Sequence, residues 1–205
     1  MENTVSDNEL ARIPTAEEKA LLGKTQGGIQ SLFMGAPIAA DDNRVVTIVD
    51  WADGSLTIAA QPDVPRNVTV ALTDADNSVT GLLTITGKDI RGRTVVETMQ
   101  PDGAGGGKTL TGTKIFASIT SAVISGTAGA APGTDQLIIG VGNVIGTPMD
   151  LDSDSNVRDV YLGGTRIASP TVTTGISLSG IDASSGTYDG SKLLHAFIDL
   201  APTNP

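Results

Sequence analysis

The sequence contains no cysteine, one histidine and few aromatic side chains, which make up 3% of its 205 residues. Without cysteine there is no disulfide framework and no thiolate nucleophile, and a single histidine is too few for a classical zinc site. Basic residues are also scarce. The chain has 13 lysines and arginines against 23 aspartates and glutamates, a net charge of −10. Because nucleic-acid binding needs clustered basic residues, we expect no nucleic-acid partner.

Long apolar runs are missing as well. No stretch approaches the ~18 apolar residues of a membrane span. The first ten residues, MENTVSDNEL, lack the basic and apolar parts of a secretion signal. We therefore expect no membrane partner, and synthesis in a cytoplasm without a secretion signal.

The residues that are abundant favour β-strands joined by turns. The chain has 18 aspartates against 5 glutamates, and its valines, isoleucines and threonines number 58. Aspartate favours turns, whereas the β-branched residues suit the pleated surface of a sheet. The composition therefore indicates an all-β protein.

The order of residues supports the same fold class. Val68, Val70 and Leu72 alternate with Thr69 and Ala71, as expected for a half-buried strand, and similar patterns recur as far as Leu200. Gly163-Gly164 stands between two such segments and predicts a two-residue hairpin. We predict a β-sandwich or jelly-roll-like barrel over residues 41–205, and the pattern leaves room for a small second β unit after about residue 148.

Residues 1–40 differ from the rest and predict an N-terminal arm. Thr15 and Glu18 form a capping box, so a short helix is expected over Ala16–Leu22, with Gly23 as its stop. Glycines then interrupt any long amphipathic element that could bury the apolar residues of the arm. We expect these residues to form an interface between molecules: Leu21, Leu22, Ile29, Leu32, Phe33 and Met34.

Three segments carry patterns that are typical of ligand sites. Asp150, Asp152 and Asp154 alternate as Ca²⁺ ligands can, but the glycine and bidentate glutamate of a calcium loop are missing, which favours a solvated acidic loop. The Gly103–Thr109 and Gly140–Gly146 segments resemble nucleotide-binding loops. Both depart from the required spacing, and neither opens a helix, so a flexible loop is favoured for the first and a glycine-rich β-bulge or turn for the second.

No catalytic constellation is recognisable. His195 lies in the last predicted strand in phase with Leu193 and Phe197, and no Gly-x-Ser-x-Gly elbow accompanies it. We expect no enzyme activity, no catalytic residue and no cofactor.

Two stretches resemble structural proteins of tailed-bacteriophage virions. The segment 13–25 is similar to junctions found in phage fibre and head-surface proteins. The strand and turn pattern from Pro65 through Gly87-Lys88-Asp89 to Gly146-Thr147-Pro148 is similar to a recurrent β-module of virion proteins. The resemblance implies a capsid cement or decoration protein on the virion surface, often a homotrimer, with the major capsid protein as its partner.

An alternative stays open beside capsid cement. A head-fibre or tail component that binds a host receptor or glycan would need exposed aromatic side chains or a cation site. The sequence offers Trp51, Tyr161, Tyr188 and the acidic loop for this purpose.

Overall fold

A computed structural model describes residues 28–73, 79–100, 108–151, 153–173, 179–183 and 185–200. Within these ranges the chain forms antiparallel β-strands and one 3₁₀ turn, which confirms the predicted all-β class. None of the described segments forms a helix long and apolar enough to cross a membrane. The helix expected over Ala16–Leu22 lies outside the described residues.

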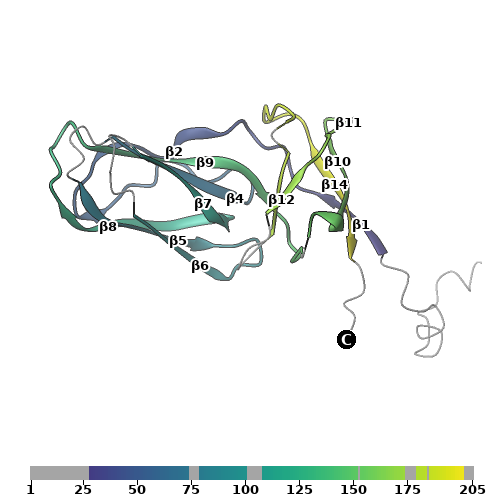
Figure 1. Ribbon diagram of the computed structural model, residues 1–205, viewed down its shortest axis with the longest axis horizontal. Coiled ribbons are helices and arrows are strands. Elements are labelled where there is room, and N and C mark those ends of the chain that lie inside the picture. Colours follow the sequence, from purple (N-terminus) through teal and green to yellow (C-terminus); the bar gives the residue numbers. More distant parts are fainter. Residues whose placement is uncertain are drawn as a thin grey trace, which may run out of the picture.

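Two sheets form a sandwich at one end of the elongated molecule (Figure 1). Sheet B has the strand order β12-β13-β9-β4-β7, with β2 also paired to β9, and sheet C has the order β3-β8-β5-β6. The strands of sheet B are β2 (Asp41–Asp50), β4 (Arg66–Leu72), β7 (Lys108–Phe116), β9 (Gln136–Gly146), β12 (Thr171–Thr173) and β13 (Gly180–Asp182). Those of sheet C are β3 (Gly54–Ser55), β5 (Thr80–Lys88), β6 (Thr94–Met99) and β8 (Ser118–Ala128).

The core of the sandwich lies between these two sheets. Val68, Val70 and Leu72 of β4 are buried, as their alternation predicted, and they share one hydrophobic cluster with Leu83 and Ile85 of β5. Burying a side chain of this size contributes roughly 1.5–3 kcal/mol, so the cluster is a main source of stability. One continuous segment joins the sheets, because β7 ends on sheet B and β8 begins on sheet C with only Ala117 between them.

The glycine-rich segment Gly140–Gly146 forms more than half of strand β9, and the register of β9 with β4 shifts between Val141 and Ile145, as at the β-bulge that the sequence favoured over a nucleotide-binding loop. A Cβ atom built on Gly140 would stand 2.1 Å from the backbone oxygen of Asp41. The glycine is therefore needed for β2 to approach β9 closely.

Sheet A lies at the other end of the molecule and has the order β1-β14-β10-β11 (Figure 1). Its strands are β1 (Gly28–Phe33), β10 (Val157–Leu162), β11 (Thr165–Arg166) and β14 (Leu194–Leu200), and the 3₁₀ turn η2 (Asp154–Asn156) precedes β10. Gly163 and Gly164 join β10 to β11 with φ values of 56° and 81°, as a tight two-residue hairpin requires, so this predicted hairpin is confirmed.

A second hydrophobic cluster lies beneath sheet A. It contains Val160, Leu194 and Ile198 from the sheet, Ile181 from β13, and Ile145 from the end of β9. Most residues of this cluster come from the part of the chain after about 148, and Met34 and Ile145 join them from earlier segments. Strand β9 contributes to both clusters, because Val141 belongs to the first cluster and Ile145 to the second.

The buried side chain of Arg66 links the two ends of the molecule. Its Nε donates to the Gly142 oxygen at 2.7 Å, and its Nη1 donates to the Ile38 oxygen at 3.2 Å and to Asp63 Oδ1 at 2.9 Å. The second oxygen of Asp63 accepts a hydrogen bond from the Ile38 N–H at 2.8 Å. The ion pair of Arg66 and Asp63 therefore holds the segment between β1 and β2 against β4 and β9.

The arm boundary at residue 40 needs correction. Residues 28–33 form an unbroken antiparallel ladder with β14, and Met34 is buried in the second cluster with an exposed fraction of 8%. The segment was assigned to an arm because its pairing partner lies more than 160 residues away in the sequence, beyond the reach of any local pattern. Residues 28–40 thus belong to the β fold.

Candidate contact surface on sheet A

One face of sheet A is turned away from the second cluster. Leu194, Ala196 and Ile198 of β14 point into the core. Because successive side chains of a strand point to opposite faces, the residues between them point away from the core. We call the residues on this side the outer face: Ile29, Ser31, Phe33, Asp159, Tyr161, Leu193, His195, Phe197 and Asp199.

Aromatic rings gather on the outer face. Phe33 stacks on His195 with ring centroids 4.2 Å apart and an angle of 6° between the planes. His195 also contacts Phe197 at 4.5 Å, and Phe197 meets Tyr161 edge to face at 6.0 Å. Strand pairing explains the cluster, since Phe33 and Tyr161 are the cross-strand neighbours of His195 on either side. Three of the six Phe, Tyr and Trp residues of the chain thus lie together with its one histidine.

Phe33 and two aliphatic side chains at this face are open to solvent, while the rings of Tyr161, His195 and Phe197 are half-buried. Phe33 has an exposed fraction of 69%, Ile29 of 62% and Leu193 of 57%. Large apolar side chains cost free energy when they lie in water, and contiguous exposed patches of them mark interaction sites in soluble proteins. The outer face is therefore the best candidate for a functional surface among the described residues.

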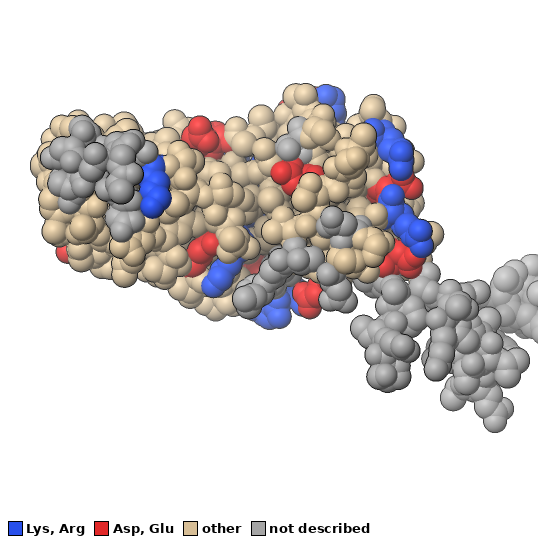
Figure 2. Space-filling model, in the orientation of Figure 1, with Lys and Arg blue, Asp and Glu red and all other residues tan. Residues whose placement is uncertain are grey.

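Charged side chains of both signs border the aromatic cluster. Arg158 binds Asp199 with its Nη2 2.6 Å from the carboxylate, and Arg166 binds Asp159 with its Nε at 2.5 Å. The hydrogen bond to Asp159 raises the pKa of Arg166, with the charge of Asp159 acting in the same direction. Figure 2 shows red and blue side chains next to one another at this end of the molecule. The apolar centre and charged border match the usual anatomy of a protein interface.

Ser31 and His195 form a hydrogen bond on this face, with Ser31 Oγ 2.6 Å from Nε2. A serine nucleophile also needs a group that orients the second imidazole nitrogen and donors for an oxyanion. Among the described residues, the Phe33 ring stacks on His195. No carboxylate among them forms a hydrogen bond with the imidazole, whose partner is Ser31. Without an orienting carboxylate among the described residues, the pair does not form a catalytic triad.

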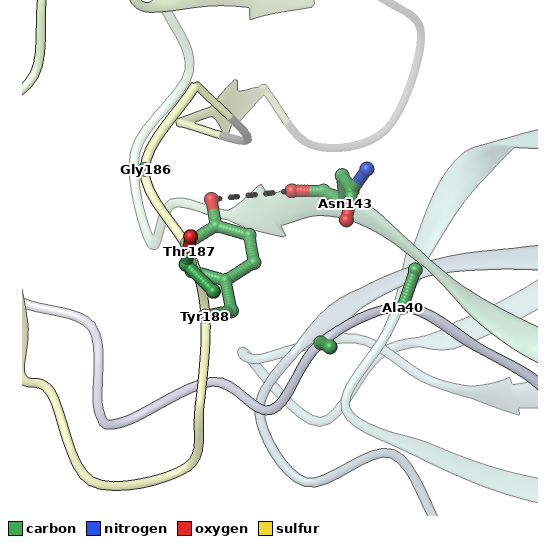
Figure 3. Close-up of a pocket in the computed structure, with 6 residues that line it drawn as sticks. Ala40, Asn143, Gly186, Thr187 and Tyr188 are labelled. Atoms are coloured by element: carbon green, nitrogen blue, oxygen red, sulfur yellow. Dashed lines mark hydrogen bonds between the residues drawn. The ribbon is translucent and has the colours of Figure 1, made fainter.

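A shallow pocket of about 290 Å³ lies between the two ends of the molecule (Figure 3). Its lining carries no charged side chain and consists of Ala39, Ala40, Asn143, Gly186, Thr187 and Tyr188. The Tyr188 hydroxyl accepts a hydrogen bond from the Ala183 N–H at 3.0 Å, and burial raises the pKa of Tyr188 to about 12. A hydroxyl held this firmly in its neutral form is suited to a structural role, and the pocket offers few groups to recognise a ligand.

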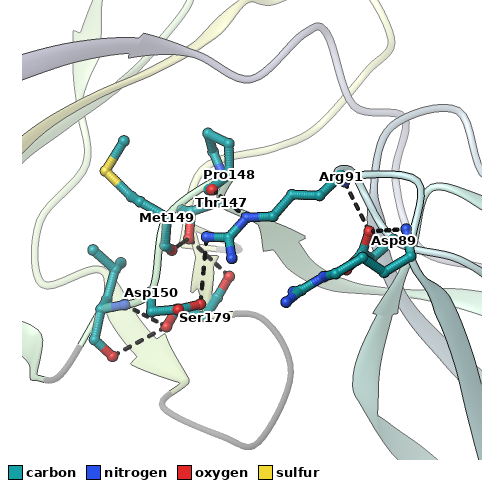
Figure 4. A network of polar contacts seen from close by, with 9 residues as sticks. Asp89, Arg91, Thr147, Pro148, Met149, Asp150 and Ser179 are labelled. Atoms are coloured by element: carbon teal, nitrogen blue, oxygen red, sulfur yellow. Dashed lines mark hydrogen bonds and ion pairs between the residues drawn. The ribbon is translucent and has the colours of Figure 1, made fainter.

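The acidic loop is tied to the sandwich by Arg91. The Arg91 Nε donates to the Pro148 oxygen at 2.8 Å, and its Nη2 lies 3.5 Å from Asp150 Oδ1 (Figure 4). Asp152 and the side chain of Asp154 lie outside the described part of the structure. Within that part no group of three or more acidic or histidine side chains is placed to hold a metal ion. Asp150 therefore acts as an ion-pair partner in this structure.

The predicted interface residues divide into three groups. Ile29 and Phe33 lie on the outer face, as an interface requires. Leu32 is half-buried against the second cluster and Met34 is buried within it, so these two residues serve the core of the same molecule. Leu21 and Leu22 lie outside the described residues.

The aromatic residues suggested for a receptor site also divide. Trp51 has an exposed fraction of 2% and donates through its Nε1 to the Thr80 oxygen at 2.9 Å, and Tyr188 has an exposed fraction of 3%. Both are core residues, so neither presents an exposed ring to a receptor, which corrects that suggestion, and Tyr188 only lines the shallow pocket. Tyr161 lies on the outer face. Sequence reasoning did not bring it together with Phe33, because the two strands are far apart in the sequence, although the shared phase of Leu193, His195 and Phe197 was visible.

Comparison with known proteins adds no relationship. No family model, no curated protein and no solved structure matches the chain.

Proposed function

We propose that the chain is a non-enzymatic structural protein of a tailed-phage virion, which decorates the head and cements neighbouring subunits of the major capsid protein. The observation that carries the proposal is the aromatic cluster on the outer face, in which the half-buried rings of Tyr161, His195 and Phe197 stand beside the exposed ring of Phe33. Such a cluster is suited to binding by surface contact. The resemblance of the sequence to virion β-modules supplies the phage setting.

A cement protein does not need a large contact area for each copy. A capsid is a lattice under internal pressure, so a protein that bridges subunits adds contacts that expansion must break. Many copies bind the same lattice, and their individual contacts add up. The outer face contributes apolar area through Phe33, Ile29 and Leu193, and its two ion pairs can fix the orientation of the contact.

The proposal is tested on particles of the source phage. Purified heads are stripped of the protein, and the recombinant full chain is then added back over a range of concentrations. We expect saturable binding to the head surface and a higher temperature of DNA release when the sites are full. Absence of the protein from purified particles, or rebinding that leaves the release temperature unchanged, contradicts a cementing role.

A second candidate is a head-fibre or tail component that binds a host glycan. The observation in its favour is the ring of Phe33, because His195 covers only one of its faces and the other is open to stack against a sugar. The test is binding of the full chain to immobilised glycans from host cells. Saturable binding that is lost in Phe33→Ser favours this candidate, whereas equal binding by both proteins contradicts it.

A further inference from the structure

Strand β1 forms one edge of sheet A, and the described residues place only β14 beside it. Its sequence is Gly-Ile-Gln-Ser-Leu-Phe, which contains neither a charged residue nor a proline. Its register with β14 runs without a bulge from Gly28 to Phe33. Natural edge strands are usually protected by charges, prolines, bulges or short length. The opposite edge follows this rule, because β11 has two residues and carries Arg166.

The backbone of β1 presents free hydrogen-bonding groups at this edge. The Met34 N–H donates to the Leu194 oxygen at 2.9 Å, which fixes the phase of the ladder. In an antiparallel pair, alternate residues direct both their N–H and C=O groups to the same neighbour. The groups of Ile29, Ser31 and Phe33 therefore point away from β14.

We infer that two copies of the chain associate by pairing their β1 strands edge to edge, antiparallel about a two-fold axis at Ser31. In this register Ser31 lies opposite Ser31 of the second copy, and Ile29 lies opposite Phe33 in both directions. Every outward N–H and C=O group of the three residues then finds a partner. The pairing is self-complementary, as a two-fold interface requires, and it places apolar residues opposite each other.

Charge favours a second copy of this chain as the occupant of the edge. The chain carries a net charge of −10, so two copies repel each other over most of their surfaces. Strand β1 is a neutral segment, and the charges nearest to it on the outer face are paired with each other, as Arg158 is with Asp199. Two copies can therefore approach at this edge with little repulsion. The resulting symmetry is two-fold, in place of the three-fold symmetry expected from the sequence resemblance.

Edge pairing makes one continuous sheet from two copies of sheet A. Both outer faces then lie on the same side of this sheet, with the Ile29 of one copy next to the Phe33 of the other. Under the proposed function, on which this step rests, the joined surface gives each dimer two contact sites for the particle. Two linked sites bind a repeating lattice more tightly than one. The pairing itself needs no particle and can be measured in solution.

The test uses two variants of the full chain at one position. Ser31→Pro removes an N–H that points away from β14, so it keeps the ladder within the molecule and blocks pairing with a second copy. Ser31→Ala is the matched control, because both variants lose the hydrogen bond to His195 but only the proline loses the N–H. Sedimentation velocity over a range of concentrations gives the mass, and circular dichroism checks the fold.

We expect dimers for the unchanged chain and for Ser31→Ala, and folded monomers for Ser31→Pro. A monomeric unchanged chain overturns the inference. An assembly of any size that survives Ser31→Pro also overturns it, as happens when residues 1–27 or another surface carries the association. Particle binding by the monomeric Ser31→Pro variant leaves the proposed function intact, so the two ideas fail separately.

A cysteine variant decides the matter if Ser31→Pro does not fold. The chain has no cysteine, so Ser31→Cys introduces the only thiol. Opposed residues of an antiparallel pair have Cα atoms about 5.5 Å apart, within the range of a disulfide. We expect rapid covalent dimer formation under mild oxidation, at least tenfold faster than for Ile48→Cys on β2, where the side chain is also exposed. Equal rates for the two variants contradict pairing at Ser31.

Discussion

Replacement of Arg66 by methionine tests how the two ends of the molecule are held together. Arg66 is fully buried, and its guanidinium donates to the oxygens of Gly142 and Ile38 and to the carboxylate of Asp63. Methionine fills much of the same volume but donates nothing, so it leaves Asp63 without its cation and the two carbonyl oxygens without a donor. Removal of one partner of a buried ion pair costs about 3–5 kcal/mol. We expect a loss of this size in the free energy of unfolding.

The assay is urea denaturation of the unchanged chain, Arg66→Met, Asp63→Asn and the double variant. Most of the cost comes from the stranded Asp63 carboxylate, so the double variant should be more stable than Arg66→Met alone. The coupling free energy between the two sites should be at least about 1 kcal/mol. A loss below about 1 kcal/mol for Arg66→Met, or strictly additive losses, would refute the reasoning.

Three further predictions follow from other buried contacts. Gly140→Ala should cost about 1–3 kcal/mol in thermal or urea unfolding, because its Cβ would stand 2.1 Å from the Asp41 oxygen, whereas Gly28→Ala, with nothing within 4 Å, should cost less than about 1 kcal/mol. The raised pKa of Tyr188, about 12, means that the folded state holds this proton more firmly, so stability should fall between pH 10 and 12 by roughly 2–3 kcal/mol. Urea titrations should show a smaller fall for Tyr188→Phe, and equal falls would contradict the argument. Burial raises the pKa of Asp89, but hydrogen bonds from Arg93 and Arg91 outweigh it and lower the pKa. The stability that Asp89 adds should therefore be present at neutral pH and disappear as the pH falls below about 4, so Asp89→Asn should lose stability at pH 7 and approach the unchanged chain at pH 2.

Local patterns predicted the strands whose two faces differ. On β4 and β5 the alternation of apolar and hydroxyl residues matches the observed burial, because one face meets the core and the other is half open. Gly163-Gly164 predicted its hairpin because positive φ at both positions is a property of the residues themselves. Such features depend on neighbours in the sequence and can be recognised without a structure.

The contact surface depends on pairs that are far apart in the sequence. Phe33 and His195 are cross-strand neighbours, yet 161 residues separate them. In β14 the phase of Leu194, Ala196 and Ile198 is apolar, whereas the other phase carries His195, Phe197 and Asp199. The alternation therefore indicated the core face of this strand, but not which strands lie beside it. Sequence reasoning therefore found Phe33 and Ile29 as interface residues and placed them in an arm, while the structure places them in a sheet beside Phe197 and Tyr161.

The central claim is that the outer face of sheet A is the surface through which the protein binds its particle, and one comparison tests it most directly. Phe33→Ser removes the most exposed ring of the cluster, and Ile48→Ser removes an apolar side chain of similar exposure from β2 in the sandwich. Both variants should fold, because both side chains are largely in water. Loss of a central aromatic contact costs about 2 kcal/mol or more in binding, so the dissociation constant of Phe33→Ser for stripped particles should rise about 30-fold. The constant of Ile48→Ser should stay within about threefold of the unchanged chain. Equal affinities for the two variants would contradict the claim.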